Sequence, residues 1–220
     1  MKMVSLPTSS DADIKEALKG LKDIAGDLEI GLAVISNKNI DSVVKLLGAP
    51  RKPAIRLEAA RVLGVSLQNN LAALKEAHKL DLVSKLLLAI EQEDDLKALD
   101  RQLFALSASV RADQLELEAF YRSRGDRVLL DVFSKSKEES VRRRILSVIV
   151  DVADPALQPE SSEGLDQEVS LLKKLDPSLK ESISSWCELL EKESIGALGE
   201  LASEALAGLA KLFPGYCHTS

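Results

Sequence analysis

The chain is poor in the residues that build sheets and many reactive sites. Aromatic side chains make up only 3% of its 220 residues, and it has two cysteines and two histidines. So little aromatic and β-branched content argues against a β-sandwich. The proportions of hydrophobic residues (45%) and charged residues (29%) also exclude a collagen-like or wholly disordered chain. The composition therefore predicts a folded, helical protein.

Motifs for catalysis, cofactors or metals are missing as well. The sequence contains no HExxH, CxxC, GxSxG, GxGxxG or GxxxxGK(S/T) arrangement. Cys187 and Cys217 lie thirty positions apart and leave the redox compartment open. Cys217 and His218 are adjacent residues near the chain end, which offer no rigid base or oxyanion hole. The acidic cluster Glu91 to Asp95 lacks the spaced ligands and the glycine of a calcium loop, so we interpret it as a solvated turn. We expect no enzyme activity, no cofactor and no metal site.

Charge and hydropathy exclude two further classes of partner. The 29 basic and 35 acidic side chains give a net charge of −6, which is unsuited to a protein that binds phosphate backbones, so we expect no nucleic acid partner. The longest strongly apolar stretches are about eight residues, too short to span a bilayer, so we expect no membrane insertion. The first ten residues lack the apolar core of a secretory signal.

A repeat is the strongest positive signal. Apolar residues recur at steps of three and four in four segments, and the equivalent positions Leu21, Leu63, Leu106 and Val148 lie 42, 43 and 42 residues apart. A second apolar pair follows a breaker in each of the first three units, with Gly31 assigned to the bend of the first. A unit of about 42 residues with two or three helices is typical of armadillo and HEAT repeats. The sequence predicts an all-α, armadillo/HEAT-like superhelical solenoid of about four repeats.

The regularity weakens after Asp151. We assign residues 11–153 to the repeats and residues 154–164, rich in proline, serine and acid, to a loop. Residues 165–213 are predicted to form a C-terminal helical cap of the same solenoid, with helices near 166–175, 178–193 and 195–212. The small residues of the last helix are expected to let it approach its neighbour closely.

Polar residues at equivalent helix ends are the candidate binding residues. Gln68, Asn69 and Asn70 follow one first-face helix, and Arg111 and Asp113 follow the next, 43 positions later. Stacked repeats align such positions along one edge of a concave surface, where solenoids bind their partners. Helix termination alone also explains asparagine and aspartate here, so that alternative stays open. Gly31 completes the candidate set, at the bend that we take as equivalent in the first unit.

Two consecutive segments carry a family resemblance. Residues 56–70, RLEAARVLGVSLQNN, resemble the pattern RxxAAxxxGxxxQNN, and residues 98–111, ALDRQLFALSASVR, are similar to KALFALSxLVR. Both patterns belong to armadillo-type nucleotide exchange factors for the seventy-kilodalton heat-shock chaperones. The resemblance covers roughly residues 14–153 and implies a non-enzymatic, monomeric co-chaperone. Such a protein clamps the chaperone's ATPase domain, promotes ADP release, and supports protein folding and translocation.

The first predicted helix bears on the compartment. Residues 17–32 are similar to the LEDLxHxIEYG segment of the branch that serves BiP in the endoplasmic reticulum lumen. We therefore expect BiP as the partner and the lumen as the location, although this sequence shows no signal peptide and no KDEL-type end. The alternatives are a cytosolic member of the same family and a generic armadillo-repeat adaptor. The adaptor is disfavoured because the single tryptophan, Trp186, lies outside the repeats.

Overall fold

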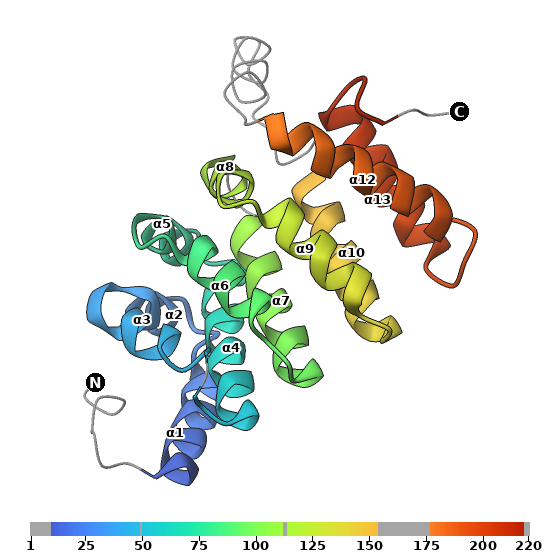
Figure 1. Cartoon of the computed structure of the whole chain (residues 1–220). Coiled ribbons are helices and arrows are strands. Elements are labelled where there is room, and N and C mark those ends of the chain that lie inside the picture. The colour runs from blue at the N-terminus through green and yellow to red at the C-terminus, as the bar shows by residue number, and fades with distance from the viewer. Residues whose placement is uncertain (1–9, 49, 112–113, 154–176, 218–220) are drawn as a thin grey trace, which may run out of the picture. The chain divides into compact units, whose positions relative to one another are not determined.

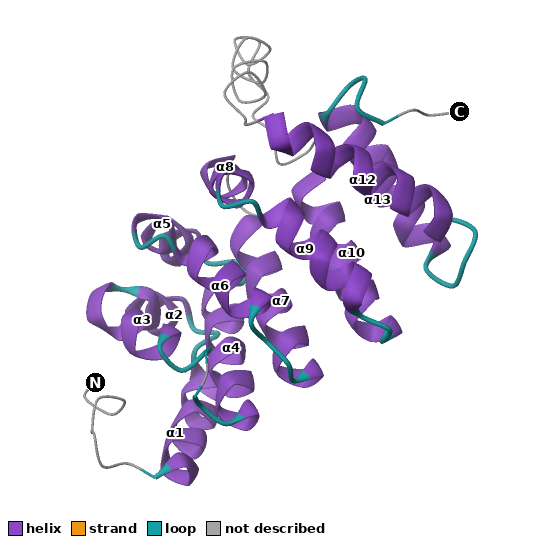
Figure 2. Ribbon diagram, viewed as in Figure 1, coloured by secondary structure: helices purple, strands orange, loops and turns teal. Residues whose placement is uncertain are grey.

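The computed structural model describes residues 10–48, 50–111, 114–153 and 177–217. All regular secondary structure in these ranges is helical (Figure 2). The chain divides into two compact units, residues 1–112 and 113–220. The predicted all-α class is confirmed.

The first unit has two layers of helices (Figure 1). Its helices are α1 (Asp11–Ile24), α2 (Leu28–Ile35), α3 (Asn37–Val44), α4 (Pro53–Leu67), α5 (Leu71–Lys79), α6 (Leu82–Glu91) and α7 (Leu96–Val110). The long helices form one layer in which α4 packs between α1 and α7. The shorter helices α2, α3, α5 and α6 cover one side of this layer. This pattern of one long and two short helices is the repeat that the 42-residue period predicted.

Local chemistry sets where the helices begin. Ser10 and Asp13 form a capping box at the start of α1, and Pro53 occupies the first turn of α4, where its missing amide costs nothing. Asp27 and Asn70 are the N-caps of α2 and α5, 43 residues apart, and each accepts a hydrogen bond from a backbone amide of its helix. The boundaries therefore follow from residues that satisfy the free amides of each first turn.

Close contacts at glycine fix how the long helices pack. A Cβ atom added at Gly64 would lie 2.4 Å from the Phe104 ring and 3.5 Å from the Cα of Ala105, so α4 and α7 meet closely there. A Cβ atom at Gly26, just beyond α1, would lie 3.6 Å from Val65 of α4. A side chain at Gly64 would displace the aromatic ring, so glycine at this position allows the two helices to approach closely.

A buried ion pair joins α4 to the loop before α7. The Arg56 guanidinium donates through Nε to Glu93 Oε2 at 2.9 Å and through Nη2 to Asp94 Oδ1 at 2.7 Å. Gln102 donates to the same Glu93 carboxylate at 2.8 Å and to the Leu47 carbonyl at 3.1 Å. The Glu93 side chain is 1% exposed, so our interpretation of this acidic cluster as a solvated turn was wrong at Glu93. Hydrogen bonding to Glu93 raises the pKa of Arg56, against the effect of its burial.

The second unit is also a helical bundle. It contains α8 (Gln114–Arg122), α9 (Gly125–Lys135), α10 (Glu139–Ala153), α12 (Pro177–Glu193) and α13 (Gly199–Leu212). α9 packs on α8, α10 and α12, and α13 packs on α10 and α12. Gly208 allows the close approach expected of the last helix, because an added Cβ would lie 2.8 Å from the Cβ of Ala153 on α10.

The start of the last helix differs from its predicted boundary. The last helix begins at Gly199 rather than residue 195, because the amides of Gly196 and Gly199 turn back to the carbonyls of Glu193 and Gly196. The two compact units divide near residue 112. The predicted end of the repeats at residue 153 is a different kind of boundary and stays a prediction. The predicted loop 154–164 and the predicted helix 166–175 lie outside the described residues.

The core of the second unit centres on the single tryptophan. Trp186 is fully buried, meets the Phe133 ring edge-on and donates from Nε1 to the Asp126 carbonyl at 2.8 Å. Burial raises the pKa of the Asp126 carboxyl and of the nearby Tyr121 hydroxyl. Arg142 of α10 stacks on the Phe133 ring of α9 and pairs with Glu193 of α12, so it serves packing between these helices.

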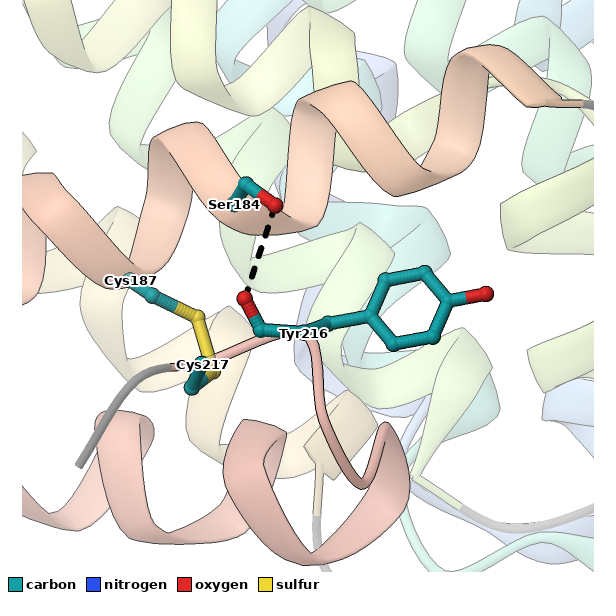
Figure 3. The surroundings of a disulfide bond; sticks show 4 residues. All are labelled: Ser184, Cys187, Tyr216 and Cys217. Atoms are coloured by element: carbon teal, nitrogen blue, oxygen red, sulfur yellow. Dashed lines mark hydrogen bonds between the residues drawn. A yellow bond between two sulfur atoms is a disulfide. The ribbon is translucent and has the colours of Figure 1, made fainter.

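A disulfide bond between Cys187 and Cys217 fastens the C-terminal segment to α12 (Figure 3). Ser184 of the same helix donates to the Tyr216 carbonyl at 3.4 Å, and Lys180 lies over the Tyr216 ring. Both cysteines are buried. The covalent link and these contacts hold Tyr216 and Cys217 against α12.

None of the helices in the described part of the chain combines the length and apolar composition that a bilayer crossing requires.

Candidate functional site

The structure separates the six candidate residues into three groups. Gln68 and Asn69, just after α4, are exposed, and so is Arg111, the C-cap residue of α7. Asn70 and Gly31 are buried. Asp113 lies outside the described residues.

Gln68, Asn69 and Arg111 lie on one edge of the first unit. The long helices run in the same direction, since Arg56 near the start of α4 meets the loop before α7 and Gly64 meets Phe104 farther along. The C-terminal ends of α4 and α7 are therefore neighbours. Asn69 has a left-handed backbone with φ of 56°, which asparagine tolerates better than most residues. Arg111 donates from Nη2 to Ser107 Oγ at 3.3 Å, a contact that orients the guanidinium along α7.

Asn70 uses its side chain to join two repeats. Its Oδ1 accepts from the Ala73 amide at 3.1 Å as the N-cap of α5, and its Nδ2 donates to the Leu28 carbonyl of α2 at 2.9 Å. Only 4% of the residue is exposed. Its polar groups therefore connect α5 to α2 within the unit and present almost no surface to a partner.

Gly31 lies beneath this link. It is inside α2 rather than at a bend, so its assignment as a breaker was wrong; the chain bends at Ser36, between α2 and α3. An added Cβ would lie 2.9 Å from Asn70 Nδ2 and from the carbonyl oxygens of Ala25 and Ser66. The true counterpart of Asn70 in the first repeat is Asp27, which the 43-residue spacing and its capping chemistry identify in the sequence.

The layer of α1, α4 and α7 also exposes side chains that the sequence analysis did not select. Leu57, Arg61 and Val65 follow one another at steps of four along the outer side of α4 and are half-buried. Arg101 and Phe104 have the same exposure on α7. These residues lie in the middles of helices, away from the polar helix ends that the repeat pattern marks as candidates.

Reactive groups are scarce in the part of the chain that the structure describes. Both cysteines form the disulfide bond and supply no free thiol, which removes the Cys217 and His218 pair from consideration. Within the described ranges, no group of three or more histidine, cysteine or carboxylate residues is arranged to hold a metal ion. What the geometry offers is a polar edge and an adjoining helical face, which suit contact with another protein.

Comparison with known proteins gives the family. Residues 2–196 match the family model described as "Nucleotide exchange factor SIL1". The rat nucleotide exchange factor SIL1 is 24% identical over 199 residues, covering 86% of this chain and 42% of the rat protein. The Hsp70 nucleotide exchange factor FES1 of Debaryomyces hansenii is 26% identical over 140 residues, covering 60% of this chain and 49% of that protein. The chain thus spans about half the length of the curated relatives it matches.

Solved structures give the fold. A crystallised engineered protein matches with a TM-score of 0.64 at 19% identity, covering 96% of each chain. A designed armadillo repeat protein in complex with the peptide (KR)4 matches with a TM-score of 0.61 at 16% identity, covering 96% of this chain and 97% of that one. The repeat period, the layered helices and these likenesses agree on an armadillo-like fold. With the family model matching most of its length, the chain belongs to the SIL1 family of nucleotide exchange factors.

Proposed function

We propose that this protein binds the ATPase domain of an Hsp70 chaperone and accelerates the release of ADP. The single observation that carries the proposal is the family match across residues 2–196, and relatives named as exchange factors support it. The protein supplies binding energy and no chemistry of its own, so the nucleotide and its hydrolysis belong to the chaperone. The proposed active form is a monomer. By accelerating nucleotide exchange, it supports protein folding and translocation.

The mechanism is a difference in affinity between two states of the chaperone. An exchange factor speeds ADP release only when it binds the opened, nucleotide-poor ATPase domain more tightly than the closed one. By thermodynamic linkage, ADP must then weaken the factor's binding by the same ratio. Affinity that does not change with ADP would contradict this mechanism.

The contact edge is assigned to Gln68, Asn69 and Arg111. All three are exposed at the C-terminal ends of the adjacent helices α4 and α7. Asp113 lies outside the described residues and stays a prediction from the sequence. Asn70 and Gly31 act on the contact indirectly, because their close packing sets where Asn69 and the start of α5 lie.

The proposed partner is BiP in the endoplasmic reticulum lumen. The disulfide between Cys187 and Cys217 supports this compartment, since disulfides persist in oxidising environments and are rare in the cytosol. The similarity of residues 17–32 to the BiP-directed branch points the same way. The cytosolic alternative is tested directly by offering both kinds of chaperone.

Release of a fluorescent ADP analogue tests these proposals. The analogue is bound to purified BiP or to a cytosolic Hsp70, and its release is followed with and without this protein. We expect faster release from BiP, with a smaller effect on the cytosolic chaperone. Arg111→Glu is expected to weaken the effect without loss of helicity by circular dichroism. Unchanged release from both chaperones would reject the exchange function and leave a generic adaptor.

A further inference from the structure

Three basic side chains form a row across the long helices of the first unit. Lys22 of α1, Arg61 of α4 and Arg101 of α7 have side chains that are 34%, 40% and 36% exposed. On α4 and α7 the two arginines share a half-exposed stripe with Leu57, Val65 and Phe104, while most other positions of these helices are buried. We call these three residues the basic row.

Contacts between the helices place the three residues at one level. A Cβ atom added at Gly26, just beyond α1, would lie 3.6 Å from Val65 of α4. These two residues are 39 apart, and the same offset sets Lys22 beside Arg61.

The same reasoning connects α4 to α7. Gly64 of α4 meets Phe104 of α7, which is 40 residues farther along the chain. Arg61 and Arg101 precede these two residues by one helical turn and are also 40 residues apart, so they lie beside each other. Packed helices are about 8–10 Å apart, so the row spans roughly 20 Å.

Each cation of the row pairs with a carboxylate, and the two arginines are more exposed than their carboxylate partners. Arg61 pairs with Glu58 at 3.4 Å, but the Glu58 side chain is only 6% exposed, so the guanidinium is the more exposed group of the pair. Arg101 pairs with Asp100 at 3.4 Å, and the arginine is again the more exposed partner. Lys22 pairs with its neighbour Asp23, the one carboxylate of the three that is more exposed than its cation. On α4 and α7 the outward charge is therefore mainly positive, in a chain whose net charge is −6.

Half-buried apolar groups flank the row. Leu57 and Val65 lie one turn to either side of Arg61 on α4, and the Phe104 ring lies over Gly64 beside them. Arginine and aromatic side chains are enriched at protein interfaces, where charged groups at the edge of an apolar centre confer specificity. The face thus combines an apolar centre with aligned cations.

We propose that the basic row binds an acidic patch on the chaperone's ATPase domain, with carboxylates spaced to meet successive helices. This inference rests on the proposed function and adds the chemistry of the partner surface. The sign of the charge excludes a basic peptide as occupant, in contrast to the designed armadillo protein solved with (KR)4. Arginine favours bidentate contact with carboxylates, which suits Arg61 and Arg101.

Charge reversal at the row tests the proposal. The variant Arg61→Glu with Arg101→Glu is compared with Lys85→Glu, whose side chain is also 36% exposed but lies on α6, in the layer of short helices. Binding to the purified ATPase domain of BiP is measured by calorimetry at low and physiological salt. We expect the double variant to bind at least about 100-fold more weakly and the control to bind within about threefold of the wild type. Wild-type affinity is expected to fall with added salt, and the double variant is expected to lose most of that dependence.

The outcomes separate the two proposals. Wild-type protein that binds neither BiP nor a cytosolic Hsp70 would reject the proposed function, and the basic row's role with it. Wild-type binding that the double variant and Lys85→Glu both retain would reject the basic row alone. If the double variant loses helicity, Arg61→Gln with Arg101→Gln replaces it, since neutral side chains of similar length remove the attraction without adding repulsion. Unchanged affinity in that pair also rejects the proposal.

Discussion

Replacement of Arg56 by methionine tests the buried ion pair of the first unit. The Arg56 side chain is 9% exposed and that of Glu93 is 1% exposed, so the substitution leaves a buried carboxylate without its cation. Breaking a buried pair in this way costs about 3–5 kcal/mol. Glu93 keeps hydrogen bonds from Gln102 and from the amides of Asp94 and Asp95, which favours the lower end, about 3 kcal/mol.

Urea unfolding of Arg56→Met measures this cost. Far-ultraviolet circular dichroism follows the helices of both units, while fluorescence of Trp186, the single tryptophan, follows the second unit. With a slope of about 2 kcal/mol per molar urea, the dichroism midpoint of the first unit should fall by about 1.5 M. Unfolding of the two units is fitted separately, because a two-unit chain need not unfold in one step.

A double-mutant cycle provides the decisive comparison. Arg56→Met combined with Glu93→Gln removes both charges, so the double variant should be more stable than the sum of the single effects predicts, by at least about 1 kcal/mol. Arg143→Met is the control, because its pair with Glu139 is more than half exposed on both sides and should contribute less than about 1 kcal/mol. A cost for Arg56→Met as small as that of the control, or additive effects in the cycle, would refute the reasoning.

Three further predictions follow from buried groups. Asn70→Asp keeps the capping oxygen but places a carboxylate against the Leu28 carbonyl. It should destabilise the first unit by about 2 kcal/mol in urea unfolding, at least as much as Asn70→Ala. Unchanged stability of Asn70→Asp would show that the 2.9 Å hydrogen bond to Leu28 contributes nothing. Cys217→Ser opens a loop of about 30 residues and should lower the stability of the second unit by about 3–4 kcal/mol in the Trp186 transition, whereas an unshifted midpoint would mean that the disulfide bond adds no stability. Burial raises the pKa of the Asp126 carboxyl above 3.8, so the folded state binds the carboxyl proton more tightly than the unfolded state does. The contribution of Asp126 to folding stability therefore falls as the pH rises from 3.8 to the folded-state pKa. Asp126→Asn should remove that fall and stabilise the second unit at neutral pH. The measurement is the urea midpoint of the Trp186 transition at several pH values, and the same pH dependence in the variant and the wild type would contradict the prediction.

Sequence periodicity predicted the helices well because it reports burial on one face of each helix. The steps of three and four around Leu63 and Leu106 correspond to fully buried positions of α4 and α7. The candidate site was harder to predict, because a polar residue at a helix end has the same sequence signature whether it caps a helix or faces a partner. Gln68 and Asn70 are two residues apart, yet the first is exposed and the second is 4% exposed.

The sequence by itself determined the helical class, the repeat of 42 or 43 residues and the family pattern, because these depend on local spacing and composition. Only the tertiary structure decided that Asn70 joins α5 to α2, that Glu93 is buried against Arg56, and that the two cysteines pair. It also aligned the basic row through offsets of 39 and 40 residues, which differ from the repeat period because neighbouring helices pack with a stagger. Side-chain packing between repeats sets that stagger, and packing depends on contacts between residues that are distant in the chain.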